Sequence, residues 1–561
     1  GDGKTIPTTI SIESKGNKWN KGEQILLVPR VVNFNAKKIN DKAKTLTSLL
    51  EKNKTSEFVD IIENPVEWSK RPLENITNDI GIRKEKVLNK VYKDASSLAT
   101  NREDDGYPLC VKQLNFLRSQ REAFQLALST KLSLIWGPPG TGKTHFLALA
   151  TLRFIEIAAA EKLPMRVLCT AYTNTAIDKL LSKINELLVY SKIVYRDIPE
   201  KGEWINRISV SRITSENSKR VKESENGFDI IGSTCWQMKK LSAKLRFDVI
   251  IVDEGSQLPV SAAMLFLDLL TPGGRLIVAG DHYQLGPVLR GKYPSIEESK
   301  YAVQGSLLEA LLRTKDGNSI SADVLPFMQS EDLANTVMLY ENNRMNQSLN
   351  KFTQRLYNRK YSSSNPSKSL YLKKKEQIIE QASRTCKEIL IPTIYDKKAS
   401  FATITLEMTK TRSLSLSKEF QLKYEANLIE RLVDSFLYLS DPELIEDIKI
   451  FIVVPHRAQR TSLQQLFKQE KYNHKNIFAD TVDRMQGQEA DIVIVSYIFF
   501  DPLQVASEAE FLFDRRRINV SISRAERFCL FIGTQSIISP PVEVLANPSS
   551  SLAYQHLKSF I

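Results

Sequence analysis

Short, continuous apolar segments recur along the chain and alternate with longer segments of helical periodicity. They form two sets separated by a gap, and β-branched residues are frequent in both. Continuous apolar runs between helices are typical of buried parallel strands. The pattern therefore predicts an α/β fold with two doubly wound parallel sheets, one from the segments that begin at residues 132, 166, 229, 247 and 275, the other from those at 448, 491 and 528.

Less regular segments lie before and between these strands. Residues 1–110 combine a strand-like segment at 23–34 with helical segments at 38–53 and 82–99, and we interpret them as an accessory or stalk domain packed on the first sheet. Polar segments of weak periodicity predict insertions near residues 190–228 and 359–420. The expected boundaries are 1–110 for the accessory domain, 111–338 and 339–545 for the two α/β domains, and 546–561 for a C-terminal tail.

Charge and cysteine content narrow the class of protein. The chain has 78 Lys and Arg against 65 Asp and Glu, and this net charge of +13 favours a polyanionic partner such as nucleic acid, although solubility alone would also explain it. No apolar run approaches the length of a membrane span. The five cysteines are scattered without a C-x-x-C pair, so we expect no zinc or iron–sulfur site and a reducing intracellular compartment, cytoplasm or nucleus.

The chain begins without Met, as expected of a fragment or a processed form, so a nuclease or another domain could lie outside it.

Residues 137–144, Gly-Pro-Pro-Gly-Thr-Gly-Lys-Thr, stand between an apolar strand and an apolar-periodic helix. In this context the spacing G-x-x-x-x-G-K-T predicts a phosphate-binding loop, whose backbone N–H groups and helix N-terminus surround the phosphates. We expect Lys143 to contact the β- and γ-phosphates and Thr144 to bind Mg²⁺. The alternative is an ordinary glycine-rich turn. The predicted nucleotide-binding residues of the loop are Gly137, Pro138, Gly140, Thr141, Gly142, Lys143 and Thr144.

Two adjacent acids, Asp253 and Glu254, end the strand that begins at residue 247. An acid at the end of a strand beside a phosphate-binding loop can hold Mg²⁺, and its neighbour can polarise the attacking water. We therefore assign Asp253, together with Thr144, to the metal and Glu254 to the water. Gln284 follows the next apolar strand, where an amide can sense the γ-phosphate.

Arg344 and Arg524 belong to the second predicted domain. The charge that develops on a transferred phosphoryl group needs cations beyond the loop lysine, and arginine supplies a planar, permanently charged fork. If both arginines serve this role, the nucleotide lies between the domains and its hydrolysis opens and closes the cleft. The predicted catalytic residues are Lys143, Asp253, Glu254, Gln284, Arg344 and Arg524.

The order of these motifs resembles that of the superfamily 1 helicases over residues 114–533, about three quarters of the chain. The most similar branch contains the RNA helicase of nonsense-mediated decay and the nuclease-helicase that trims Okazaki flaps. Residues 479–496 and 516–526 carry the most specific motifs. The resemblance implies two RecA-like domains with ATP and Mg²⁺ between them, single-stranded nucleic acid across their top, and 5′-to-3′ movement.

The resemblance also implies roles for individual residues. Gln120 would contact the adenine, and Gln486, Gly487 and Glu489 would link the nucleic acid and the ribose of the nucleotide. The residues expected on the nucleic-acid path are Thr173, Asn174, Ala176, Thr234, Pro455, His456, Thr481, Gln486 and Ser521.

Two positions depart from the family pattern. The family usually has a tyrosine that stacks on the adenine just before the arginine at 344, but Asn343 stands there, and Tyr340 is our candidate substitute. The family motif Asp-Glu-Ala has Gly255 in its third place here, from which we expect a loss of rigidity and no loss of chemistry.

Three hypotheses follow for the function. The favoured one is an ATP-driven helicase or translocase on single-stranded DNA or RNA, with DNA slightly favoured because residues 481–497 and 519–525 look more like those of DNA-repair members. The second is an ATP-gated module that binds or remodels nucleic acid without unwinding it, and that uses the same residues. The third, a GTP-binding switch, lacks a suitably placed guanine-binding motif. Protein partners through the N-terminal region are a further expectation.

Overall fold

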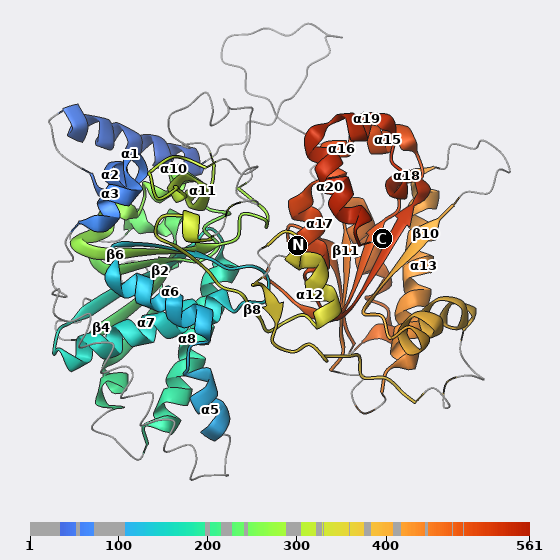
Figure 1. Cartoon of the computed structure of the whole chain (residues 1–561), viewed down its shortest axis with the longest axis horizontal. Coiled ribbons are helices and arrows are strands. Elements are labelled where there is room, and N and C mark those ends of the chain that lie inside the picture. The colour runs from blue at the N-terminus through green and yellow to red at the C-terminus, as the bar shows by residue number, and fades with distance from the viewer. Residues whose placement is uncertain are drawn as a thin grey trace, which may run out of the picture.

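Two parallel sheets organise the chain, and each is the centre of one α/β domain (Figure 1). The computed structural model describes residues 34–51, 56–71, 107–196, 202–214, 227–240, 245–287, 305–320, 328, 330–357, 360–374, 378, 383–407, 417–441, 443, 447–473, 475–485 and 487–560. Among the helices in these ranges, none has both the length and the apolar composition that crossing a membrane requires.

The first sheet has seven parallel strands in the order β3-β4-β2-β5-β6-β1-β7. The predicted α/β fold with doubly wound parallel sheets is confirmed, and every segment expected in this sheet forms a strand. The strands are β1 (Leu132–Trp136), β2 (Met165–Ala171), β3 (Ile208–Arg212), β4 (Phe228–Thr234), β5 (Phe247–Val252), β6 (Leu270–Gly280) and β7 (Thr336–Met338). The edge strand β3 lies within the insertion expected near residues 190–228, so this part of it belongs to the sheet.

Helices cover both faces of the first sheet (Figure 1). One face packs against α5 (Tyr107–Gln113), α6 (Arg118–Ser129), α7 (Lys143–Ala160) and α8 (Asn174–Val194). The other packs against α1 (Phe34–Glu51), α2 (Glu57–Glu63), α3 (Pro65–Lys70), α10 (Val260–Ala263) and α11 (Leu307–Leu311). The described part of residues 1–110 thus packs on the first domain, whereas the strand expected at residues 23–34 and a helix expected at 82–99 lie outside the described residues, apart from Phe34.

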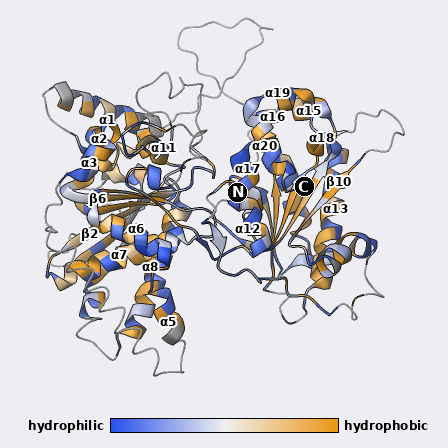
Figure 2. Ribbon diagram, viewed as in Figure 1, coloured by the Kyte–Doolittle hydropathy of each residue, from blue (hydrophilic) through white to orange (hydrophobic). Residues whose placement is uncertain are grey.

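The second sheet has five parallel strands in the order β10-β14-β13-β11-β12. They are β10 (Phe401–Leu406), β11 (Lys449–Val454), β12 (Asn476–Thr481), β13 (Ala490–Tyr497) and β14 (Ala525–Thr534). In both sheets the central strands are strongly apolar (Figure 2). The edge strand β10 lies within the insertion expected near residues 359–420, so at least this segment is part of the second domain.

Helices also cover the second sheet on both faces. One face packs against α13 (Lys418–Leu439), α14 (Arg457–Leu466) and two π-helical turns, Cys386–Leu390 and Pro392–Asp396. The other carries α12 (Gln347–Gln354), α15 (Pro502–Ser507), α16 (Ala509–Leu512), α17 (Arg515–Ile522), α18 (Gln535–Ile538), α19 (Val542–Ala546) and α20 (Pro548–Lys558). The predicted tail is therefore mostly the helix α20, whose end packs Phe560 against Phe352 with ring centroids 4.8 Å apart.

A two-stranded parallel ribbon of β8 (Glu341–Asn342) and β9 (Ser362–Ser363) leads from the first domain to the second. Short 3-10 turns complete the described elements: Glu203–Arg207, Cys235–Lys240, Leu267–Leu269, Ser330–Asp332 and Glu470–Tyr472. The two domains share a hydrophobic core of aromatic side chains that includes Trp136 and Tyr283 of the first and Tyr357 and Tyr361 of the second. The carboxyl edge of the first sheet therefore faces the second domain.

A buried carboxyl group ties the helices of the second domain to its sheet. Glu425 of α13 is 2% exposed, and its Oε1 accepts hydrogen bonds from Ser496 of β13 and from Gln459 of α14, the latter at 3.0 Å. Burial raises the pKa of Glu425 to about 7, from an ordinary value of 4.5. The neutral acid is thus the form that the folded domain favours.

Because this pKa is raised on folding, its stabilising contribution is complete below pH 4.5 and is lost as the pH rises through 7. We expect Glu425→Gln to abolish this loss, since an amide oxygen can accept the same two hydrogen bonds. The variant should be more stable than the wild type at pH 8 by about 3 kcal/mol and roughly equal to it at pH 4, as measured by urea unfolding. Glu419→Gln, an exposed change on the same helix, should keep the wild-type pH dependence. An unchanged pH dependence in Glu425→Gln would contradict the assignment.

Candidate functional site

The phosphate-binding loop connects β1 to α7 at the carboxyl edge of the first sheet. Gly140 and Gly142 have φ angles of 76° and 73°, which residues with a side chain rarely adopt. A Cβ at Gly137 would lie 2.1 Å from Lys143 Cγ, because the lysine folds back over the loop and its Nζ donates to the Gly137 carbonyl at 2.5 Å. The glycines thus make room both for the turn and for the lysine inside it.

Asp253 and Glu254 follow β5, the strand that lies two places from β1 in the sheet. Thr144 Oγ1 donates to Asp253 Oδ2 at 3.0 Å, so the two groups predicted to hold a metal are in contact. Burial, and then the charge of Glu254, raise the pKa of Asp253 to about 6, while Lys143 opposes the shift. Glu254 lines the neighbouring pocket, with a φ of 52° that turns it away from the strand. The two acids therefore face different surroundings.

Gln284 belongs to a buried network at the end of β6. Its Nε2 donates to Asp281 at 2.9 Å, and the Tyr357 hydroxyl of the second domain donates to the same carboxylate oxygen at 2.7 Å. Asn519 of α17 in turn donates to the Tyr357 oxygen and to the Tyr283 carbonyl, each at 2.9 Å. The network links the end of β6 directly to the second domain.

Arg344 reaches the pocket because Asn342 and Asn343 contact the phosphate-binding loop. Asn343 N donates to the Gly140 carbonyl at 2.8 Å, and a Cβ at Gly140 would lie 2.1 Å from Asn342 Oδ1. That Asn342 oxygen accepts from the backbone N–H of Arg344 at 2.9 Å. The guanidinium then donates to Glu489 at 2.7 Å and to the Ser523 carbonyl at 3.0 Å.

Arg524, at the end of α17, is buried against the same pocket. Its guanidinium donates to the Val520 and Gln488 carbonyls at 3.0 and 3.1 Å, and to Gln284 Oε1 at 3.4 Å. Burial and then the neighbouring Arg344 lower the pKa of Arg524 to about 9, which still leaves it charged at neutral pH. The predicted γ-phosphate sensor of the first domain thus touches the predicted arginine of the second.

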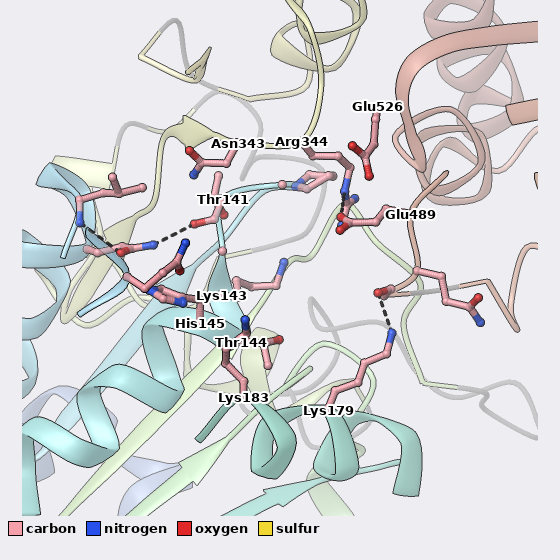
Figure 3. Close-up of a pocket in the computed structure, with 18 of the residues that line it drawn as sticks. Thr141, Lys143, Thr144, His145, Lys179, Lys183, Asn343, Arg344, Glu489 and Glu526 are labelled. Carbon is pink, nitrogen blue, oxygen red and sulfur yellow. Dashed lines mark hydrogen bonds and ion pairs between the residues drawn. The ribbon is translucent and has the colours of Figure 1, made fainter. Parts of the chain in front are cut away.

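These groups surround one pocket of about 940 Å³ between the domains (Figure 3). Eight Lys or Arg side chains line it against four Glu, an excess that suits a polyanion such as a triphosphate. The predicted residues on its wall are Gln120, Gly140, Thr141, Gly142, Lys143, Thr144, Glu254, Gln284, Arg344, Glu489 and Arg524. Gly137, Pro138 and Asp253 are not on the wall, although each of them contacts a residue that is.

Several lining residues escaped the sequence analysis. Lys112, Lys179, Lys183, Lys368 and Lys449 come from four different segments of the two domains, two of them from α8. His145, directly after the loop, also lines the pocket. Burial and then Lys183 lower its pKa to about 4, so the imidazole is neutral at neutral pH.

The two residues predicted to contact the adenine, Gln120 and Tyr340, lie in different places. The Gln120 side chain caps α6 through Leu117 N at 3.2 Å and donates to the Thr141 carbonyl at 3.3 Å, which fixes it beside the loop. Tyr340 is not brought to this pocket. Its hydroxyl donates to Glu122 at 3.3 Å, and its ring lines a separate pocket, because β7 directs it to the far side of α6.

The described residues predicted to bind nucleic acid lie at strand ends or helix starts in both domains, except Ser521, which lies in the last turn of α17. Thr173 caps α8 by accepting from Ala176 N at 3.3 Å, and Asn174 accepts from Arg212 at 2.6 Å. Pro455 and His456 follow β11, and His456 lines a pocket of about 740 Å³. Thr234, Thr481 and Ser521 are buried, and Gln486 lies outside the described residues.

Gly255 has a different role from the one expected. A Cβ there would lie 2.5 Å from Val278 Cγ1 and 3.3 Å from the Ala279 carbonyl of β6. The glycine therefore permits close packing of the Asp253–Glu254 turn on β6. The expected loss of rigidity does not describe this tightly packed position.

Comparisons with known proteins match both domains. Two family models, each described as an AAA domain, match residues 120–290 and 321–536. The DNA replication ATP-dependent helicase/nuclease DNA2 of Saccharomyces cerevisiae is 25% identical over 450 residues, which are 76% of this chain and 26% of the relative. The ATP-dependent helicase upf1 of Schizosaccharomyces pombe is 25% identical over 465 residues, which are 75% of this chain and 45% of the relative. The chain therefore spans between a quarter and a half of the length of these relatives.

Among solved structures, the DUF1998 helicase MrfA bound to DNA is 11% identical over 78% of this chain and 51% of its own, with a TM-score of 0.40. A TM-score this low carries no weight for the fold or the function. The sequence relatives extend over three quarters of the chain, and the two AAA domain models together include both halves of the pocket. The resemblance to superfamily 1 helicases that the motifs predicted is therefore confirmed.

Proposed function

We propose that this chain hydrolyses ATP and uses the energy to move along single-stranded nucleic acid as a helicase or translocase. The observation that carries the proposal is the pocket itself, in which the phosphate-binding loop and acids of one domain meet Arg344 and Arg524 of the other. A site split in this way is complete only when the domains are together, so it can couple nucleotide chemistry to their movement.

The residues present fit a nucleotide with Mg²⁺. The glycine cradle leaves space that a Cβ would fill, and the Thr144 hydroxyl and Asp253 carboxylate, 3.0 Å apart, are oxygen donors of the kind that Mg²⁺ prefers. When bound, Mg²⁺ would supply positive charge to the phosphate oxygens. In the same proposal Lys143 neutralises the β- and γ-phosphates, and Glu254 orients the attacking water.

Arg344 and Arg524 would stabilise the charge that develops during phosphoryl transfer. Both are held by hydrogen bonds from their own domain, so little reorientation is needed once the domains meet. Gln284 would report the presence of the γ-phosphate through Arg524, and Asp281 and Tyr357 would carry the same change into the second domain. Gln120 and Glu489 remain our proposed contacts for adenine and ribose, respectively, and the stacking role expected of Tyr340 has no support in its position.

The nucleic-acid partner is proposed from charge and from the family. The net charge of +13 favours a sequence-tolerant grip on phosphates that weakens with salt. We propose 5′-to-3′ movement, with DNA slightly preferred over RNA, in a reducing intracellular setting, cytoplasm or nucleus, that suits the five free and buried cysteines. Protein partners through the N-terminal region also remain a proposal. The alternative function is an ATP-gated binding module that does not unwind.

We expect ATP turnover to rise at least several-fold when single strands are added, because strand binding and domain closure share the same interface. Turnover measured with matched poly-dT and poly-U, and strand displacement measured on a 5′-tailed duplex, test the proposal. No stimulation by either polymer would refute the motor. Stimulation without displacement would leave the ATP-gated module.

Lys143→Ala should lower ATP turnover by at least about 10³-fold, because it removes the loop cation that the transferred phosphate requires. Binding of a fluorescent single strand should stay within about twofold of the wild type, since phosphate contacts to the strand lie elsewhere. Lys192→Ala, on the exposed far end of α8, should change neither measurement. Substantial turnover in Lys143→Ala would contradict the assigned site.

A further inference from the structure

Lys179 spans the cleft between the two domains. It lies in the second turn of α8 in the first domain, and its Nζ donates to the Gly487 carbonyl of the second domain at 2.8 Å (Figure 3). Lys183 stands one helical turn further along the same pocket wall and pairs with Glu186 of its own helix at 2.7 Å. Lys179 therefore contacts the second domain, whereas Lys183 pairs within its own helix.

Three successive residues of the second domain each receive one cation of the pocket. Gly487 accepts from Lys179, the Gln488 carbonyl accepts from Arg524 at 3.1 Å, and the Glu489 carboxylate accepts from Arg344 at 2.7 Å. The segment 487–489 is therefore the common support of both predicted catalytic arginines. Lys179 is the cation that ties this support to the first domain.

The three cations are held to different extents. Arg524 has three hydrogen-bond acceptors and Arg344 has two, whereas Lys179 has the Gly487 carbonyl alone among the described residues. Burial and then the charge of Arg524 lower the pKa of Lys179, because both disfavour the charged ammonium group. The hydrogen bond to the Gly487 carbonyl stabilises that charged form. Within the described part of the chain, no carboxylate lies within ion-pair distance of it.

Gly487 suits this contact. Its φ of 74° turns the backbone so that its carbonyl faces α8, a conformation that favours glycine. A Cβ at this position would lie 3.6 Å from Lys179 Nζ, so the lysine approaches the backbone itself. Because the acceptor is a main-chain oxygen, the hydrogen bond fixes the path of the segment and not only a side chain.

We propose that Lys179 is a positioning residue for ATP hydrolysis, which holds the segment 487–489 against the first domain and thereby aligns Arg344 and Arg524 with the phosphate-binding loop. The inference rests on the proposed function. Lys179 acts through the two arginines, which stabilise the transition state. Removal of its ammonium group therefore lowers kcat and leaves the KM for ATP largely unchanged. A direct contact of Lys179 with the nucleotide would instead raise KM.

The test compares Lys179→Met, Lys179→Arg and Lys192→Met with the wild type in strand-stimulated ATP turnover. Lys179→Met should lower kcat about tenfold with KM for ATP within about twofold, because one charge-assisted hydrogen bond is lost. Lys179→Arg retains a cationic donor and should recover most of kcat. Lys192→Met removes the same charge from the exposed far end of the same helix and should stay within about twofold of the wild type.

A second measurement does not depend on turnover. Amide hydrogen exchange of a peptide that contains residues 487–489 should be faster in Lys179→Met than in the wild type or in Lys192→Met. Unchanged exchange and unchanged kcat in Lys179→Met would overturn the proposal, as would a rise in KM at constant kcat. If the wild type itself shows no ATP turnover, the proposed function fails, while the exchange measurement still decides whether Lys179 holds this segment.

Discussion

The close approach of Gly140 to Asn342 and Asn343 is the contact on which the composite pocket depends. One domain contributes a loop with no side chain at the point of contact, and the other contributes a backbone N–H and an amide oxygen. Arg344 directly follows Asn343, so this contact holds the backbone of Arg344 close to the phosphate-binding loop. A bulkier residue at 140 would separate the domains at the place where the chemistry needs them together.

Electrostatics explains why the surrounding groups are buried in networks and not as isolated charges. A buried ion without a partner is strongly unfavourable, and both arginines and the carboxylate of Asp281 are satisfied by hydrogen bonds from main chain or side chain. The remaining excess of positive charge lies on the open wall of the pocket, where water or an anion can reach it. The protein thus places its fixed charges where a polyphosphate would compensate them.

The sequence was informative wherever the signal was local. Apolar runs predicted the central strands, and the phosphate-binding loop, the acids after β5 and the arginine motifs identified residues that the fold brings to one pocket. Short or mixed strands such as β3 and β7 gave no clear pattern, because their stability comes from neighbouring strands. Asn342, Tyr357 and Lys179 contact the other domain, and the motifs beside Asn342 and Lys179 do not show which side chain makes that contact. The position of Tyr340, beside Glu122 and away from this pocket, likewise depends on tertiary structure.

The packing of Gly255 on β6 has a consequence for related chains. An alanine at this position, which the family motif usually carries, would overlap Val278 by more than a small shift can relieve. A chain with alanine at 255 should therefore carry a smaller residue than valine at 278, so that the summed volume of the pair stays constant. The two sites are expected to change together over evolutionary time, although neither takes part in the chemistry.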